Sequence, residues 1–103
     1  MKKIVDGKVY NTETAECIAE WDNGFYGNDF KRCEESLYKT KKGAYFLAGE
    51  GGPMSKYARP VGNMTGGGDG LEPITEHEAQ KWLEDRDFTK ELEEYFSEQL
   101  QEA

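Results

Sequence analysis

The stretch Leu37–Ala58, LYKTKKGAYFLAGEGGPMSKYA, decides the fold of this chain. Its first half contains two β-favouring runs, Leu37-Tyr38 and Tyr45-Phe46-Leu47, separated by Lys41-Lys42-Gly43. Glycine tolerates the positive φ of a tight turn, so this pattern predicts a β-hairpin. Its second half begins Gly49-Glu50-Gly51-Gly52-Pro53, where regular strand pairing has to stop. We therefore expect the hairpin to form the centre of a small sheet, with a glycine-rich loop after it.

The residues before this hairpin predict further strands. Ile4–Tyr10 is expected to form a small hairpin, with Asp6-Gly7 suited to a type I′ turn. Alternation then predicts a half-buried strand with Ala15, Cys17, Ala19 and Trp21 on one face and Glu16, Ile18, Glu20 and Asp22 on the other. Two alternatives stay open: Thr14–Glu20 is also compatible with a short helix, and Phe30–Ser36 is either a helical turn or the lead-in to the central hairpin.

The last third of the chain predicts an edge strand and two helices. Leu71–Ile74 is expected at a sheet edge because Pro73 has no N–H to donate. Thr75-Glu76-His77-Glu78 matches a capping box at a helix start. A second helix is expected from near Asp87, with the apolar stripe Phe88, Leu92, Tyr95, Phe96 and Leu100. The predicted fold is α+β: a small antiparallel sheet of about four to five strands followed by two C-terminal helices.

Length and charge predict one domain with two unlike halves. A chain of 103 residues supports one modest core, so 1–103 is expected to be a single domain with a sheet half, 1–74, and a helical half, 75–103. The net charge is −8, and acids balance bases up to Gly70, so the whole excess follows Leu71. Direct nucleic-acid binding is not expected from this acidic half, because phosphate affinity requires cations. An anionic surface favours a basic partner instead.

Other features limit the chemistry that is expected. No apolar run approaches the ~20 residues of a membrane helix, and Met1-Lys2-Lys3 leads into strand-like residues, so a cytoplasmic protein is expected. Cys17 and Cys33 are isolated, which predicts reduced thiols and no metal site. His77, the only histidine, has no visible nucleophile beside it. No catalytic residue and no cofactor are predicted.

Two surfaces are candidates for binding. The first comprises an acidic helical surface with a pair of loop aromatics as anchors: Asp85, Asp87, Glu91, Glu94, Glu98, Phe25 and Tyr26. Such acidic runs are often only a solvated face, but their mutual repulsion is easier to explain if they meet a basic partner. The second is the glycine-rich loop. It lacks the P-loop spacing, and its glycines are explained by a wide turn, but an anion site remains the alternative at Gly51, Gly52, Lys56, Tyr57 and Arg59.

Three segments carry a resemblance to a known family. They are KKIVDGKVYNTETAE (2–16), the hairpin and loop at 37–58, and PITEHEAQKWLE (73–84). Together they resemble small acidic proteins of phages and conjugative elements of Gram-positive bacteria, in which GKxYNTETA, YxTKxGxYFLxGEGG and ITExEAxxW recur in this order. That group resembles anti-CRISPR proteins directed at type II systems, which inhibit Cas9. The resemblance extends to Leu83, and its motifs contain no reactive group.

The resemblance implies a non-enzymatic inhibitor that binds Cas9, alone or with its guide, and blocks guide RNA loading or DNA engagement. Cas9 holds nucleic acid in positively charged channels that an acidic protein could occupy. Two other hypotheses stay open. One is a nucleotide-binding anti-defence protein that uses the Gly49–Gly52 loop with Lys56 and Arg59. The other is an enzyme that modifies the guide RNA, which the lack of an evident general base disfavours.

Overall fold

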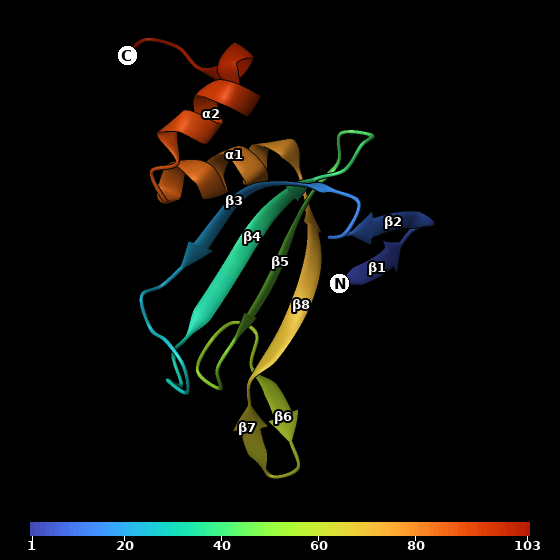
Figure 1. Cartoon of the computed structure of the whole chain (residues 1–103), viewed down its shortest axis with the longest axis vertical. Coiled ribbons are helices and arrows are strands. Elements are labelled where there is room, and N and C mark those ends of the chain that lie inside the picture. Colours follow the sequence, from blue (N-terminus) through green and yellow to red (C-terminus); the bar gives the residue numbers. More distant parts are fainter.

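The computed structural model describes residues 1–103 and confirms the α+β fold (Figure 1). A four-stranded antiparallel sheet has the order β3-β4-β5-β8, and two helices pack at one end of it. Two separate two-stranded hairpins, β1-β2 and β6-β7, lie outside this sheet. The strands are β1 (Lys2–Val5), β2 (Lys8–Asn11), β3 (Glu16–Asp22), β4 (Cys33–Lys39), β5 (Tyr45–Gly51), β6 (Arg59–Val61), β7 (Met64–Gly66) and β8 (Gly68–Ile74).

The predicted central hairpin is β4-β5, and the prediction is confirmed. Leu37 pairs with Leu47, and Gly43 occupies the turn with φ +91°. The open question about Phe30–Ser36 is resolved, because this segment leads directly into β4. β8 lies at the sheet edge, where Pro73 needs no ladder donor, as expected. The first hairpin also forms as predicted, with Asp6 and Gly7 both at positive φ.

The alternation predicted along β3 is wrong before Ala19: Ala15 packs against the small core of Tyr10, Phe46 and Leu71, and Cys17 is exposed, whereas Ala19 and Trp21 face the main core. The segment is a strand, which excludes the short helix, but its pairing with β4 shifts between Cys17 and Ala19. Such a β-bulge inserts one extra residue and breaks the period of two. As a result Ile18 and Ala19 are both buried in the same core, although alternation assigns them to opposite faces.

The helices begin where the sequence predicts. α1 (Glu76–Asp85) has the capping box: Thr75 accepts from the Glu78 amide and Glu78 accepts from the Thr75 amide, both at 3.0 Å. α2 (Thr89–Tyr95) is followed by a single turn, η1 (Ser97–Gln99). The apolar stripe ends at Phe96, and Leu100 is exposed, because α2 ends before it. The main core consists of Ile18, Ala19, Leu37, Tyr45, Leu47, Ala79, Trp82, Leu83, Leu92 and Phe96. Neither helix has the length and apolar composition that crossing a bilayer requires.

The two helices meet at a Schellman motif that contains aspartate where glycine is usual. The Phe88 amide donates to the Leu83 carbonyl (3.0 Å) and the Asp87 amide to the Glu84 carbonyl (3.2 Å). Asp87 has φ +58°, a left-handed conformation that glycine adopts at lower cost. This junction turns the chain so that Phe88 stacks on Trp82, with ring centroids 5.7 Å apart.

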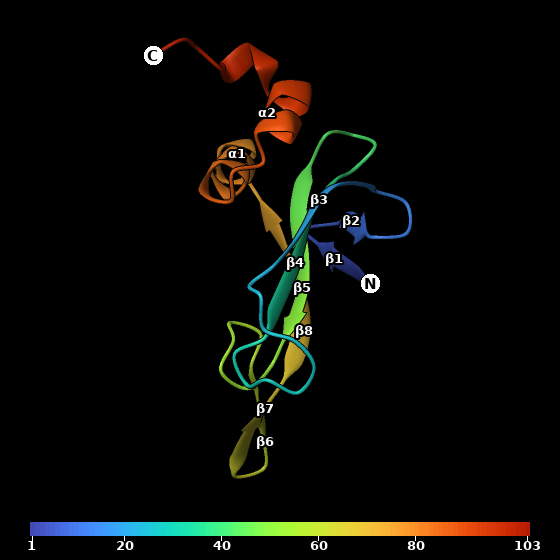
Figure 2. The ribbon, with the colours of Figure 1, turned by 60° about the vertical axis from the view of Figure 1, so that its left-hand side comes forward.

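The two faces of the sheet are covered differently. On one face the helices cover one end, and the loop after β5 lies on the same side farther along the sheet (Figure 2). On the other face the β1-β2 hairpin places Tyr10 against Phe46, edge to face at 5.7 Å, and these residues form a second core with Leu71. The remainder of that second face is open to solvent. Polar groups on the first face are therefore enclosed by the helices and the loop, whereas those on the second face are exposed.

Candidate functional site

A buried carboxylate, Glu35, lies at the junction of the sheet, the glycine-rich loop and α1. Its side chain is 2% exposed. It accepts hydrogen bonds from the Tyr57 hydroxyl (2.7 Å), the Trp82 indole N–H (3.2 Å) and the Arg86 guanidinium (3.3 Å). The Lys56 ammonium lies 2.8 Å from its second oxygen. One carboxylate therefore ties the loop to the helix, and we call these five residues the Glu35 centre.

Arg86 enters this centre between two indole rings. Its guanidinium carbon lies 4.5 Å from the ring centroids of both Trp21 and Trp82. A planar, weakly hydrated guanidinium stacks well on aromatic faces, which offsets part of the cost of removing it from water. Its Nε is buried without a partner. The two tryptophans and Glu35 thus fix the C-terminal end of α1 on the sheet.

The surroundings keep Glu35 ionised. Burial by itself opposes ionisation, but the hydrogen bonds from Lys56, Tyr57 and Trp82 outweigh it and lower the pKa of Glu35. Burial and the bond to Glu35 raise the pKa of Tyr57, so the phenol stays a donor. A carboxylate held as an anion by donors on every side is a structural anchor.

The glycines of the loop region provide room for Tyr57. Gly49 and Gly70 are paired neighbours on β5 and β8. A Cβ at Gly49 would lie 2.5 Å from the Tyr57 ring, and one at Gly70 would lie 3.5 Å from it. A Cβ at Gly51 would overlap Ser55. These glycines therefore allow the loop to lie flat on the sheet and Tyr57 to reach Glu35.

The predicted anion-binding residues come together in this region, but their polar groups already have partners. Lys56 and Tyr57 bond to Glu35, and the Arg59 guanidinium donates to the Asp69 carbonyl. The Gly52 amide donates to the Arg32 carbonyl (2.8 Å), and Gly51 is part of β5. An anion at this loop would have to compete with Glu35 for Lys56.

The predicted acidic residues are distributed along the helical end. Glu94 and Glu98 line one groove of about 430 Å³ together with Glu76, and we call it the helical groove. Lys39 and Gln99 also line it, and the Gln99 amide donates to Glu76 (3.0 Å). Elsewhere, Asp85 pairs with Lys81 at 3.1 Å, Asp87 occupies the helix junction, and Glu91 is half-buried on α2.

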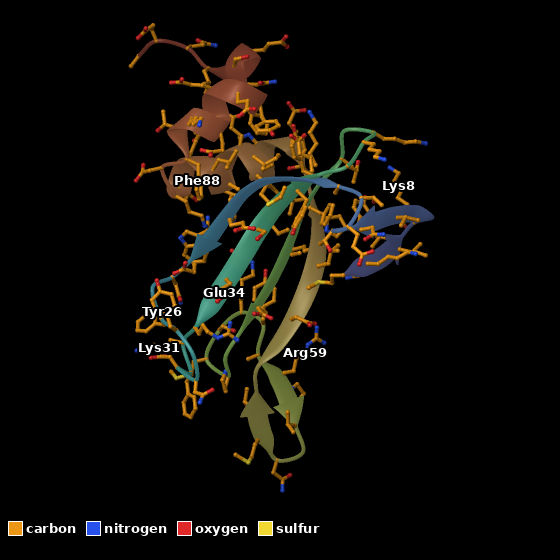
Figure 3. The ribbon with its side chains drawn as sticks, viewed as in Figure 1. Lys8, Tyr26, Lys31, Glu34, Arg59 and Phe88 are labelled. Carbon is orange, nitrogen blue, oxygen red and sulfur yellow. The ribbon has the colours of Figure 1, made fainter.

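The predicted aromatic anchors lie far from these helices. Phe25 and Tyr26 are exposed on the loop between β3 and β4, at the opposite end of the sheet from Phe88 (Figure 3). Phe30 of the same loop is exposed too, and its carbonyl accepts from the Met54 amide at 2.7 Å. The predicted partner-binding set is therefore divided between an acidic helical end and an apolar loop end.

A second acidic surface, which was not predicted from the sequence, lies across the open face of the sheet. Pairing places Asp22 opposite Glu34, Glu34 opposite Glu50, and Glu50 opposite Asp69. Directly paired residues project from the same face, so the four carboxylates form one row, which we call the acidic row. Arg32 lies 3.4 Å from Glu34 and 3.3 Å from Glu50 and neutralises only part of it. No signal in the sequence indicates this row until the strand register is known.

The remaining reactive side chains are dispersed. His77 is exposed at the start of α1 and lines a shallow groove with Lys56 and Lys81. Cys17 and Cys33 are free thiols, and burial raises the pKa of both. No three metal-ligating side chains cluster together. Comparison of the chain with family models, with curated proteins and with solved structures finds no match.

Proposed function

We propose that this protein is a non-enzymatic anti-CRISPR inhibitor that binds a basic surface of Cas9 and prevents guide RNA loading or DNA engagement. The family resemblance of the three sequence segments suggests the target, and the placement of charge supports the mode of binding. The protein would act in the cytoplasm of the bacterial host, where Cas9 encounters nucleic acid.

The observation that carries the proposal is that the carboxylates of the acidic helical end, which follow Leu71, have almost no cationic partners. Asp85 is the only carboxylate after Leu71 that pairs with a cation. Neither helix has a basic residue within its last turn, and the one cation at the C-terminal end of α1, Arg86, pairs with Glu35 of the sheet and not with a helical carboxylate. A surface with this much unpaired negative charge favours the binding of a basic partner and does not stabilise the protein itself.

The helical groove supplies the geometry for such a contact. Three carboxylates, Glu76, Glu94 and Glu98, line a concave surface of the size of a few side chains. Lysine or arginine side chains that bind phosphates in a nucleic-acid channel would find carboxylate oxygens there instead. Occupation of the channel by the protein then excludes the guide or the target strand, and no bond needs to be broken.

The acidic row and the apolar loop end form a second candidate surface, because the row lies on the sheet face opposite the helices. The row adds carboxylates on the open sheet face, and Phe25 and Tyr26 offer exposed aromatic area near that end of the sheet. Interfaces combine aromatic contacts with a charged rim, and a standard one covers roughly 800 Å² per partner. The molecule measures 49 × 35 × 19 Å, which is large enough to present such an area on one side.

The direct test is capture of Cas9 by the immobilised protein, with and without guide RNA. A variant with Glu91→Gln, Glu94→Gln and Glu98→Gln should retain the fold and capture much less Cas9. A matched variant with Glu13→Gln, Glu72→Gln and Glu84→Gln makes the same change in net charge outside α2 and η1 and should capture nearly as much Cas9 as the wild type.

Comparison of the two Cas9 forms identifies the blocked step. Capture of Cas9 alone that is lost when guide is bound indicates competition for the guide channel, whereas capture of the guide-bound form indicates a block at DNA engagement. Failure to capture either form, with a correctly folded protein, contradicts the proposal.

A further inference from the structure

Acidic and basic side chains lie in different places on the sheet half, although their numbers are nearly equal in the sequence. A cleft of about 620 Å³ lies between the β1-β2 hairpin and the β4-β5 turn. Figure 3 shows Lys8 on that hairpin, beside the turn. The cleft is lined by Gly7, Lys8, Val9, Tyr10, Asn11, Thr14, Thr40, Lys41, Lys42 and Ala44. It contains three lysines and no acid, so it is locally cationic in a chain whose net charge is −8.

The lysines of this cleft have no partner within the protein. The ammonium groups of Lys8, Lys41 and Lys42 form no ion pair, no hydrogen bond and no aromatic contact. In contrast, Lys39 lies over the Tyr45 ring and Lys3 donates to the Leu71 carbonyl. Three other lysines also lack such contacts, but they do not line the cleft: Lys2, Lys31 and Lys90. The cleft therefore gathers free ammonium groups in one concave place.

Neutral donors lie beside these lysines. The Thr40 hydroxyl oxygen accepts from the Ala44 amide, which leaves its proton available to donate. The Asn11 side-chain oxygen accepts from the Glu13 amide, which leaves its NH₂ group available. Val9, 52% exposed, and Ala44 add apolar surface. Ammonium groups, a hydroxyl, an amide and a small apolar patch are the contacts that a phosphate-bearing ligand with an organic part requires.

We infer that this cleft binds the phosphates of a nucleotide, either free or as a unit of a single strand. Its volume lies within the range of about 300–1,000 Å³ that is typical of small-ligand sites. Three unpaired lysines match a ligand with several phosphate charges better than a ligand with the single charge of a carboxylate. The site lies on the sheet half, across the β4-β5 turn from the helical groove, and it does not depend on the proposed binding to Cas9.

The test is fluorescence anisotropy with a labelled uridine 12-mer RNA at low salt. The cleft variant carries Lys8→Gln, Lys41→Gln and Lys42→Gln. The matched control carries Lys2→Gln, Lys31→Gln and Lys90→Gln, which changes the net charge equally. We expect at least tenfold weaker binding for the cleft variant and less than twofold for the control. The slope of log affinity against log salt should fall by about 2, or roughly 0.7 for each lost phosphate contact.

Competitors identify the source of the phosphate. Displacement of the labelled RNA by a nucleoside triphosphate as readily as by unlabelled 12-mer indicates a site for the free nucleotide, and stronger displacement by the 12-mer indicates a strand. Displacement by inorganic phosphate alone at equal concentration overturns the assignment to nucleotides. Equal weakening in both variants, or no binding of any of these ligands by the wild type, overturns the site itself. All six substituted lysines lie outside the cores, and circular dichroism of both variants confirms that they are folded.

Discussion

Glu35 and the carboxylates of the helical groove have the same acidic chemistry in opposite surroundings. Glu35 is buried and receives donors from Lys56, Tyr57, Trp82 and Arg86. In the helical groove, Glu94 and Glu98 form no ion pair. The chain thus places two of its cations on one interior carboxylate and leaves those of the helical groove without a cationic partner. This comparison separates a carboxylate that holds the fold from carboxylates that are available to a partner.

Removal of Glu35 should have the largest effect on stability. Glu35→Ala leaves the largely buried Arg86 without its carboxylate, and loss of one partner of a buried ion pair typically costs about 3–5 kcal/mol. Lys56 adds little to this cost because its side chain is half exposed and can be hydrated. Urea denaturation should show this loss in the free energy of unfolding. Glu94→Ala should change the same quantity by less than about 0.5 kcal/mol, because it is a surface substitution. Equal effects of the two substitutions would contradict the comparison.

Filling the space under Tyr57 should have the next largest effect. Gly49→Ala places a Cβ 2.5 Å from the Tyr57 ring, and overpacking of this kind costs about 1–3 kcal/mol. Gly70→Ala is the matched control, because its Cβ would lie 3.5 Å from the same ring, an ordinary contact. Thermal unfolding of the two variants compares them directly. A Gly70→Ala variant as unstable as Gly49→Ala would contradict a cost that is set by the contact with Tyr57.

Acidification should weaken the Glu35 centre. The pKa of Glu35 is lower in the folded state than its ordinary value of 4.5. Its contribution is therefore fully present above that ordinary value and is lost as pH falls through the lower folded-state value. Wild-type stability should decline over this acidic range more steeply than that of a Glu35→Gln variant. Parallel pH profiles of unfolding free energy for the two proteins would contradict the assignment.

Relief of the strained helix junction should give a small gain. Asp87 has φ +58° at a position that favours glycine, so Asp87→Gly should raise the free energy of unfolding by up to about 1 kcal/mol. Asp87→Asn keeps the side-chain size, removes the charge and separates the charge effect from the backbone effect. Destabilisation by Asp87→Gly would show that the aspartate side chain stabilises this turn.

Much of the fold follows from local signals in the sequence. The turn at Gly43, the proline at the sheet edge and the capping box at Thr75 each depend on residues close together in the chain. Physical rules for turns, edges and caps are local, so these elements could be predicted without knowing the rest of the structure. The bulge between Cys17 and Ala19 could not, because it depends on pairing with a distant strand.

The site was harder to predict, for the same reason. Glu35 shares the strand face of Cys33 and Leu37, which signals burial, but its partners lie between 21 and 51 residues farther along the chain. The acidic row and the lysine cleft also form only when the strands pair. Composition described the first 70 residues as neutral, whereas the structure separates acids and lysines within them.

The affinity for Cas9 at two salt concentrations tests the central claim most directly. If the uncompensated carboxylates of the helical groove carry the interaction, affinity should fall at least tenfold between 50 and 300 mM KCl, since salt screens exposed charges. The Glu91→Gln, Glu94→Gln, Glu98→Gln variant should bind more weakly at low salt and respond less to salt. An affinity that is the same at both salt concentrations, and the same in the variant, would contradict the account.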